Sequence, residues 1–479
     1  MPRRPENSTR PKAQDTNARR STQASFDTKG CFHDGCGGSS SDTLGLFRRE
    51  RRRPLCRDLR EGESILKIQI PRDRVLYLSF TGILEPLGYS QVFRLLRGLS
   101  KAHVRYALVS LERARDLAQL NRLAEVKSEL EAVGIDWIPI RYLDGSARNI
   151  ASNLARALAA VLQRIKRGDV RLIHARGYMA ASVALAAKSI TGVPYIFDFR
   201  GYWVDERRES GRWFVGDRRY RAGKQWERSL FAGCCASVSL TEAGAEDVRT
   251  GVFGPWPSER PSLVIPTCVD FDAFSLRRGE EAPARHHRLA GKLVVGFIGS
   301  LNASYRVTES IELFLQISRL RDDAHLLCLT SQVEEITTRL AHAGVGRARF
   351  TALNVPHTEI ADWLHQVDWG LLVLNTPYAK RASMPTKLGE FFASGVAPLH
   401  EGCNADVARW ISRSGCGHTL STGTPAGIAA GAHYVASTTL KIDDLREARR
   451  RTEAHFSLAS GIERYHKLLS TLLGEPGSV

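Results

Sequence analysis

The residues best suited to chemistry lie in the segment YAKRASMPTKLGEFFASGVAPLH, residues 378–400. It places Lys380 just before a predicted helix and Lys387 in that helix's first turn. Glu390 follows one turn later on the same face. Cations at a helix N-terminus favour a bound anion, and a carboxylate there accepts the two hydroxyls of a ribose. The alternative is an ordinary Lys–Glu pair on a helix, worth only about 0.3–0.5 kcal/mol.

The start of this helix is predicted near Met384 or Pro385, because proline suits the first turn of a helix. Ser383 is then the expected N-cap. Gly395 is expected to end the helix before the strand-like run APLH.

A second polar segment, FDFRGYWVDERRESG, covers residues 197–211 and follows a strand-like run. Asp198, Arg200, Trp203 and Asp205 combine carboxylates, a guanidinium and an aromatic ring. Sugars present hydroxyl groups and flat C–H faces, so these side chains suit sugar recognition. The alternative is a charged surface loop.

His174 and Arg176 lie at the end of another strand-like run, in IHARGYMAA at residues 173–181. We expect the two side chains to point in opposite directions, one toward the core and the other toward a cleft. A structural role for His174 is the alternative.

Gly88, Tyr89 and Ser90 stand between the first strand-like run and a helical pattern. Glycine at a helix N-terminus lets backbone N–H groups approach a phosphate or a sugar hydroxyl. The segment is neither GxGxxG nor a P-loop, so an ordinary turn between a strand and a helix is the alternative.

Short apolar runs alternate with helical patterns, which is the pattern of parallel sheets with helices on both faces. The predicted strands are 74–80, 104–111, 135–140, 170–175, 195–199, 237–241, 263–267, 293–301, 324–330, 348–353 and 369–375. The clearest helix covers residues 147–166 and is amphipathic.

The alternation breaks at a predicted linker over residues 270–291 and then restarts. We therefore predict two doubly wound domains, with ligands bound in the cleft between them, beyond the carboxyl ends of the strands. The predicted parts are a disordered basic tail (1–70), an N-terminal domain (74–275), a C-terminal domain (290–455) and a closing helix (456–473).

The 479 residues carry a formal net charge of +17, which is compatible with an anionic membrane surface, phosphorylated substrates or nucleic acid. No nucleic-acid motif accompanies the charge, so nucleic acid is not an expected partner. There is neither an apolar run of 18 residues nor a secretory signal, which favours a cytoplasmic protein. Cys31, His33 and Cys36 lack a second ligand pair, so no metal site is expected.

Residues 74–473 resemble the group 1 (family 4) retaining glycosyltransferases, which have the GT-B fold of two facing Rossmann-like domains. The resemblance rests on LGYSQV after the first strand, VIPTCVDFDAF at 264–274, GFIGSL at 296–301 and MPTKLGEFFASGVAPL. The final segment FSLASGIERYHKLL is similar to the family's closing helix, which commonly returns to the first domain.

The resemblance implies transfer of a sugar from a nucleotide-sugar donor to a glycan or lipid-linked acceptor, as in surface polysaccharide or glycoconjugate synthesis. It implies a donor substrate but no cofactor, and a location in the cytoplasm or at the inner face of the plasma membrane. The catalytic candidates are Lys387, Glu390 and Arg176. The donor-binding candidates are Gly88, Tyr89, Ser90, Gly299, Ser300, Lys380, Ser383, Pro385, Thr386, Lys387 and Glu390. The acceptor-binding candidates are His174, Asp198, Arg200, Trp203 and Asp205.

The sequence departs from the family in three places. Glu390 matches the second glutamate of the E-x7-E motif, but Ala382 stands where the first would be. Only Arg306 is near the position of the usual Arg and Lys pair of the second domain. Arg176 replaces the second histidine of H-x-H. The alternative function is therefore a non-catalytic or epimerase-like GT-B protein that binds a sugar nucleotide.

Overall fold

The computed structural model describes residues 74–274, 276 and 285–474, apart from Val215, Ala303, Thr376, Cys403 and residues 421–422. The predicted tail at 1–70, with Cys31, His33 and Cys36, lies outside the described residues. So does the part of the predicted linker at 277–284.

The first sheet has seven parallel strands in the order β3-β2-β1-β4-β5-β6-β7. Its strands are β1 (Arg74–Ser79), β2 (Arg105–Glu112), β3 (Asp136–Arg141), β4 (Val170–Arg176), β5 (Tyr195–Asp198), β6 (Ala236–Ser239) and β7 (Ser262–Val264). The strand order reverses between β1 and β4, so the expected ligand position is at the carboxyl ends of these two strands.

The helices of this half begin with one continuous helical stretch: α1 (Pro86–Gly88), a π-helical turn (Tyr89–Phe93) and α2 (Arg94–Lys101). The others are α3 (Ala114–Leu117), α4 (Leu120–Ala132), α5 (Ala147–Lys166), α6 (Gly177–Thr191), α7 (Trp203–Glu209), α8 (Arg218–Gly233) and α9 (Glu242–Arg249). The helix predicted at 147–166 is α5, and the Ser146 side chain caps it by accepting a hydrogen bond from Asn149 N.

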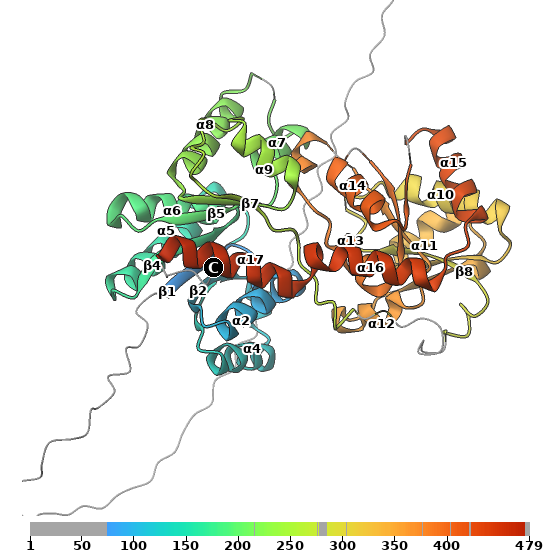
Figure 1. Ribbon diagram of the computed structural model, residues 1–479, viewed down its shortest axis with the longest axis horizontal. Coiled ribbons are helices and arrows are strands. Elements are labelled where there is room, and N and C mark those ends of the chain that lie inside the picture. The colour runs from blue at the N-terminus through green and yellow to red at the C-terminus, as the bar shows by residue number, and fades with distance from the viewer. Residues whose placement is uncertain are drawn as a thin grey trace, which may run out of the picture. The chain divides into compact units, whose positions relative to one another are not determined.

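The second sheet has six parallel strands in the order β10-β9-β8-β11-β12-β13. They are β8 (Leu293–Ile298), β9 (Ala324–Leu329), β10 (Phe350–Leu353), β11 (Trp369–Val373), β12 (Ala397–Glu401) and β13 (His418–Thr419). The strand order reverses between β8 and β11. The predicted fold class, two Rossmann-like doubly wound α/β domains, is confirmed (Figure 1).

The helices of the second half cover both faces of this sheet, except for the last, α17, which packs on the first sheet. They are α10 (Val307–Leu320), α11 (Val333–His342), α12 (Ile360–Leu364), α13 (Thr386–Ser394), α14 (Ala405–Ser414), α15 (Pro425–Ser437), α16 (Ile442–Phe456) and α17 (Leu458–Leu473). Short 3-10 turns occupy Arg347–Arg349, His357–Glu359 and, as η5, Tyr378–Ala382. None of the helices in the described part of the chain is both long and apolar enough to cross a bilayer.

Side chains on successive strand residues enter opposite faces of each sheet, and this builds two cores per sheet. In β1, Leu76 and Leu78 join the core on one face, while Val75 and Tyr77 join the core on the other. The second of these cores also includes Tyr465 of α17, so the C-terminal helix completes the first sheet's hydrophobic core, beside α2 (Figure 1).

The chain passes between the two sheets at two adjacent places. Val269 follows the first sheet and Ser457 precedes α17, and the two form a parallel bridge. Val269 N donates to Phe456 O at 2.8 Å, and Leu458 N donates to Val269 O at 2.8 Å. The outgoing and returning segments are therefore held to each other by backbone hydrogen bonds.

Candidate functional site

A pocket of about 500 Å³ lies where α1 meets the ends of β8 and β11 and the start of α13. Its lining residues are Pro86, Leu87, Ser90, Gly299, Ser300, Asn302, Ser304, Tyr305, Leu374, Asn375, Lys380, Ser383, Met384, Pro385, Thr386, Lys387, Glu390 and Asn404. Nine of the eleven donor-binding candidates are in this lining, and the exceptions are Gly88 and Tyr89. The structure thus brings together residues that are separated by up to 300 positions in the sequence.

Gly299, the first residue after β8, has a backbone that only glycine adopts easily. Its φ is 138°, and a Cβ atom built there would lie 3.3 Å from the Tyr305 hydroxyl. The glycine therefore allows the chain to turn sharply past the Tyr305 ring and places Ser300 at the pocket.

The helix α13 begins at Thr386, with Pro385 as its N-cap and no side chain capping its first N–H groups. The predicted N-cap, Ser383, is therefore wrong: this residue lies in extended backbone, and its hydroxyl donates to Arg200 O at 3.2 Å. The open helix start faces the pocket through Pro385, Thr386 and Lys387. This arrangement is favourable for a negatively charged group.

Lys387 and Glu390 form an ion pair of 3.0 Å on the pocket side of α13. Their side chains are 18% and 3% exposed, so this is not the exposed surface pair that the alternative interpretation requires. Burial alone would lower the pKa of Lys387, but the neighbouring Glu390 carboxylate outweighs it and raises the pKa. The pair presents both a hydrogen-bond donor and an acceptor to the pocket.

Lys380 belongs to η5, a turn that is anchored on the first half of the chain. Its Nζ lies 2.6 Å from the Glu206 carboxylate, and Arg381 Nε lies 3.0 Å from that of Asp247. Ala382 is fully buried and packs within a core of the first sheet. The glycosyltransferase family that the sequence resembles has a glutamate at this position, whereas in this protein the position belongs to a hydrophobic core.

Gly88, Tyr89 and Ser90 do not precede a helix, as predicted, but lie inside one that starts at Pro86. The signal for the earlier start is Pro86 itself, at the first helical position. A Cβ atom at Gly88 would lie 1.8 Å from the carbonyl oxygen of Gly82. Gly88 thus permits close packing of two backbone segments, and it is Ser90 that reaches the pocket.

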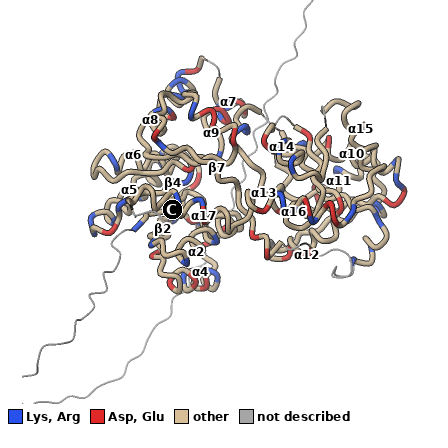
Figure 2. The backbone as a smooth tube through the Cα atoms, viewed as in Figure 1, with Lys and Arg blue, Asp and Glu red and all other residues tan. Residues whose placement is uncertain are grey.

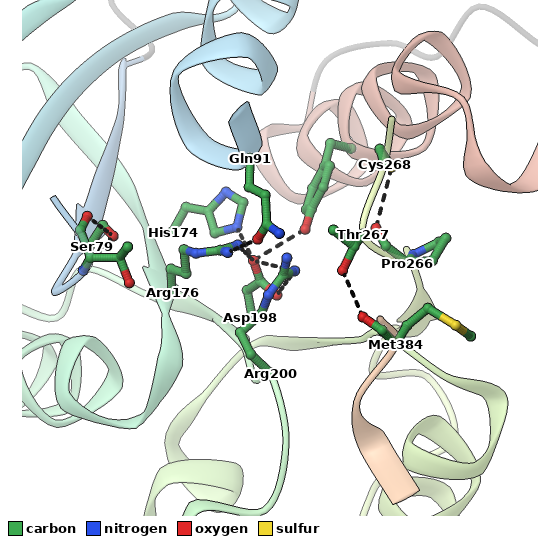
Figure 3. A network of polar contacts seen from close by, with 12 residues as sticks. Ser79, Gln91, His174, Arg176, Asp198, Arg200, Pro266, Thr267, Cys268 and Met384 are labelled. Carbon is green, nitrogen blue, oxygen red and sulfur yellow. Dashed lines mark hydrogen bonds and ion pairs between the residues drawn. The ribbon is translucent and has the colours of Figure 1, made fainter. Parts of the chain in front are cut away.

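Asp198, at the end of β5, is the centre of a buried polar cluster. Its Oδ2 lies 3.6 Å from His174 Nε2 and 3.8 Å from Arg176 Nη1, and its Oδ1 lies 3.1 Å from Arg200 Nη1. Figure 3 shows these side chains turned toward Asp198. The prediction that His174 and Arg176 point in opposite directions is wrong, because residues two apart on a strand share a face.

The groups around Asp198 favour the ionised form of its carboxyl group. Burial alone would raise the pKa of Asp198, but Arg200 and Arg176, together with the nearby His174 ring, outweigh it and hold that pKa well below its usual range. Burial also lowers the pKa of His174, so the ring is neutral at neutral pH. Two guanidinium groups then face one carboxylate, which leaves one positive charge at the carboxyl edge of the first sheet.

Trp203 and Asp205 lie apart from this cluster, although they follow it closely in sequence. The turn at Gly201 and the start of α7 carry them to a different neighbourhood. Trp203 packs on Tyr178, Trp213 and Trp226. Asp205 is buried and accepts hydrogen bonds from Tyr220 and Lys224. Neither residue lines the pocket at α13.

Several pocket residues carried no recognisable signal in the sequence. Asn302, Ser304, Tyr305, Asn375 and Asn404 are small or polar residues of loops. Asn404 holds η5 and the residue after it in place by donating to the carbonyls of Lys380 at 3.3 Å and Ser383 at 2.9 Å. The position of Asn302, Ser304 and Asn375 in the loops that follow β8 and β11 would have been a usable signal, because ligands bind at that edge.

Comparisons with known proteins support this assignment of the fold. Residues 90–264 match the family described as "Glycosyl transferase 4-like domain". No curated protein matches the sequence.

Three similar solved structures are informative. Anabaena HepE in complex with UDP is 13% identical with a TM-score of 0.60, over 83% of this chain and 100% of that chain. A glycosyltransferase from Rickettsia africae is 12% identical with a TM-score of 0.61, over 85% and 100%. A putative UDP-N-acetylglucosamine 2-epimerase from Listeria monocytogenes is 10% identical with a TM-score of 0.54, over 84% and 97%. The likeness shows a GT-B-like fold for the described chain.

Proposed function

We propose that this protein is a glycosyltransferase that moves a sugar, with retention of anomeric configuration, from a nucleotide-sugar donor to a glycan or lipid-linked acceptor. We assign it to surface polysaccharide or glycoconjugate synthesis. The observation that carries the proposal is the pocket at the start of α13, where the partly buried Lys387–Glu390 pair lies beside an uncapped helix N-terminus. The similarity of the fold to that of HepE in complex with UDP supports the same assignment.

The charges of the pocket suit the leaving group of such a reaction. When the bond between the anomeric carbon and the diphosphate breaks, negative charge develops on the diphosphate. The pocket lining carries two lysines, Lys380 and Lys387, which can donate to a diphosphate although each is paired in the structure, with Glu206 and Glu390 respectively. The N-terminus of α13 adds a partial positive charge. Glu390 is assigned to the ribose hydroxyls, which need an acceptor.

The acceptor is assigned to the carboxyl edge of the first sheet. Asp198 and His174 are fully buried, so they act there through Arg200, whose side chain is 21% exposed. A second, much smaller cavity next to Arg176 and Arg200 shares Ser90 with the donor pocket. The two regions are thus adjacent, as transfer between two substrates requires.

An anionic membrane surface is the proposed docking partner, since a lipid-linked acceptor resides there. Phe214, in the loop between α7 and α8, is 70% exposed. Arg212, Arg218, Arg219 and Arg221 beside it are also exposed. Figure 2 shows basic residues along this loop and α8. Exposed aromatic and basic side chains together favour the headgroup region of anionic lipids.

A second candidate is an epimerase-like or non-catalytic protein that binds a sugar nucleotide. It is favoured by Ala382, at the position of the family's first motif glutamate, and by the fold's likeness to the putative 2-epimerase. The release of nucleoside diphosphate from the sugar nucleotide is measured with and without acceptor extracts. Release that depends on the acceptor separates transfer from epimerisation and from simple binding.

The first test is a thermal-shift screen of the full chain against UDP-, GDP-, ADP- and TDP-sugars. A ligand at about 100 times its Kd stabilises the fold by about 2.7 kcal/mol. We expect one nucleotide family to raise the Tm, and Glu390→Ala to abolish the shift. Glu390→Gln keeps the size of the side chain and serves as a second variant if the alanine variant is unstable.

The matched control is Glu447→Ala, which removes a glutamate that pairs with Arg450 and Arg451 on the exposed face of α16. It should keep the nucleotide-dependent shift of the wild type. Absence of any shift with the folded wild-type chain would overturn the proposed function.

A further inference from the structure

A chain of hydrogen bonds connects the Asp198 cluster to the donor pocket. Arg176 Nη2 donates to Gln91 Oε1 at 2.6 Å. Gln91 Nε2 in turn donates to Thr386 Oγ1 at 2.9 Å. Gln91 comes from the π-helical turn after α1, and Thr386 is the first residue of α13. Figure 3 shows Gln91 and Arg176 meeting above Asp198.

In this series of hydrogen bonds, the chemical groups themselves determine which side chain donates and which accepts. A guanidinium group has donors and no acceptor, so the carbonyl oxygen of Gln91 must face Arg176. The amide NH₂ of Gln91 then faces Thr386 and must donate to its hydroxyl oxygen. The hydroxyl hydrogen of Thr386 is consequently directed away from Gln91. Within the described part of the chain it has no acceptor, and Thr386 lines the donor pocket.

Arg176, the first donor in this series of hydrogen bonds, is held in place by its surroundings. Arg176 is 9% exposed, and Asp198, to which it is paired, is fully buried. An arginine does not lose its proton in a protein, so the direction of the hydrogen bonds does not change with pH in the neutral range. Gln91 itself is not among the residues that line the donor pocket, so it acts on a ligand only through Thr386.

We propose that Gln91 is a positioning residue that makes Thr386 a hydrogen-bond donor toward the pocket and thereby selects a ligand oxygen that only accepts, such as a phosphoryl oxygen of the donor diphosphate. This inference rests on the proposed function, because the ligand is taken to be a nucleoside diphosphate sugar. It adds a neutral donor to the positive charge of Lys387 and of the α13 N-terminus. A hydrogen bond to a charged acceptor is stronger than one between neutral groups.

The test reverses the direction of one hydrogen bond. In Gln91→Glu, the carboxylate accepts from Arg176 and also from the Thr386 hydroxyl, which then turns its hydrogen away from the pocket. Calorimetry should show about tenfold weaker binding of the nucleoside diphosphate that stabilises the wild type. Thr386→Val, which removes the hydroxyl at similar size, should weaken binding equally. Thr386→Ser keeps the hydroxyl and should bind as the wild type does.

The new negative charge of Gln91→Glu would also repel a diphosphate directly, and the double variant separates the two effects. If the hydroxyl carries the effect, Gln91→Glu weakens binding no further in a Thr386→Val background. An equal loss in both backgrounds would show direct repulsion and overturn the inference, as would wild-type affinity in Thr386→Val. If the folded wild-type chain binds no nucleoside diphosphate, the proposed function fails first, and the inference fails with it.

Discussion

The hydroxyl of Tyr465 donates a hydrogen bond of 3.2 Å to the carboxylate of Asp198, across 267 positions of sequence. Both residues are buried, and the Tyr465 ring also packs on His174. Tyr465 belongs to α17 and Asp198 ends β5. The C-terminal helix is therefore joined both to the apolar core of the first sheet and to the polar cluster at its carboxyl edge.

Removing this hydroxyl should destabilise the fold. Tyr465→Phe deprives a buried carboxylate of one donor, and we expect the free energy of unfolding to fall by about 1–2 kcal/mol. Urea denaturation measures the change. Tyr434→Phe, at a tyrosine that is 39% exposed on α15, should change the free energy by less than about 0.5 kcal/mol. Equal stability of wild type and Tyr465→Phe would show that Asp198 is satisfied without α17.

The protein should lose stability as the pH falls below about 6.5, the ordinary value for histidine. Burial lowers the pKa of His174, His325 and His400, and that of His325 to about 4. Below pH 6.5 the unfolded chain takes up protons that the folded chain does not. The stability from these neutral rings is therefore fully present above pH 6.5 and is lost as the pH falls toward their folded pKa values.

Each such histidine steepens the fall of the free energy of unfolding by at most about 1.4 kcal/mol per pH unit. Urea midpoints between pH 5 and pH 8 measure the slope, and His325→Gln should make it shallower. His433→Gln, on the exposed side of α15, is the control and should leave the slope unchanged. A flat profile over this range in the wild type would contradict the prediction.

Introducing at position 382 the glutamate that the resembled glycosyltransferases carry should not raise sugar-transfer activity. The Cβ atom of Ala382 is only 2.8 Å from where a Cβ atom of Gly244 would be, and Ala382 is fully buried. Ala382→Glu would place a carboxylate in this core, so we expect a loss of at least about 2 kcal/mol in unfolding free energy. Ala430→Glu, on the exposed face of α15, should be tolerated. Higher sugar-transfer activity in a stable Ala382→Glu variant would refute this expectation.

Gly88→Ala should disturb the start of α1 and, through it, the pocket. The added Cβ atom would lie 1.8 Å from the Gly82 carbonyl oxygen, so one of the two backbones must move. We expect a loss of about 1–3 kcal/mol in unfolding free energy and weaker nucleotide binding, because Pro86 and Leu87 line the pocket. The matched control is Gly346→Ala, where the Cβ atom meets nothing within 4 Å. Similar behaviour of the two variants would contradict the packing argument.

The architecture and part of the pocket at the start of α13 could be predicted from sequence because their signals are local. Short apolar runs between amphipathic helices determine the two sheets, and the spacing of Lys387 and Glu390 places both side chains on one helix face. Gly299 and Ser300 were indicated by the resemblance to the glycosyltransferase family, because the strand predicted at 293–301 included both residues.

The remaining features depend on contacts that local spacing does not encode. Trp203 and Asp205 follow Asp198 closely in sequence, but the start of α7 turns them into a separate cluster. Tyr465 and Gln91 gain their roles only when distant elements pack together. Ser383 has the residue type of an N-cap, but Pro385 ends the extended segment two residues later and fixes the helix start at Thr386.

The parallel bridge between Val269 and Ser457 has a consequence for the order in which the molecule forms during synthesis. The ribosome releases every strand of the first sheet before it makes the second sheet, but α17 follows only after the second sheet is complete. Until then the part of that sheet face that α17 covers is exposed, although α2 and α4 already cover the rest, and Asp198 lacks one of its donors. The nascent first half therefore keeps apolar surface exposed until α17, nearly two hundred residues later in the sequence, has been synthesised. During this interval it is most prone to aggregate or to bind a chaperone.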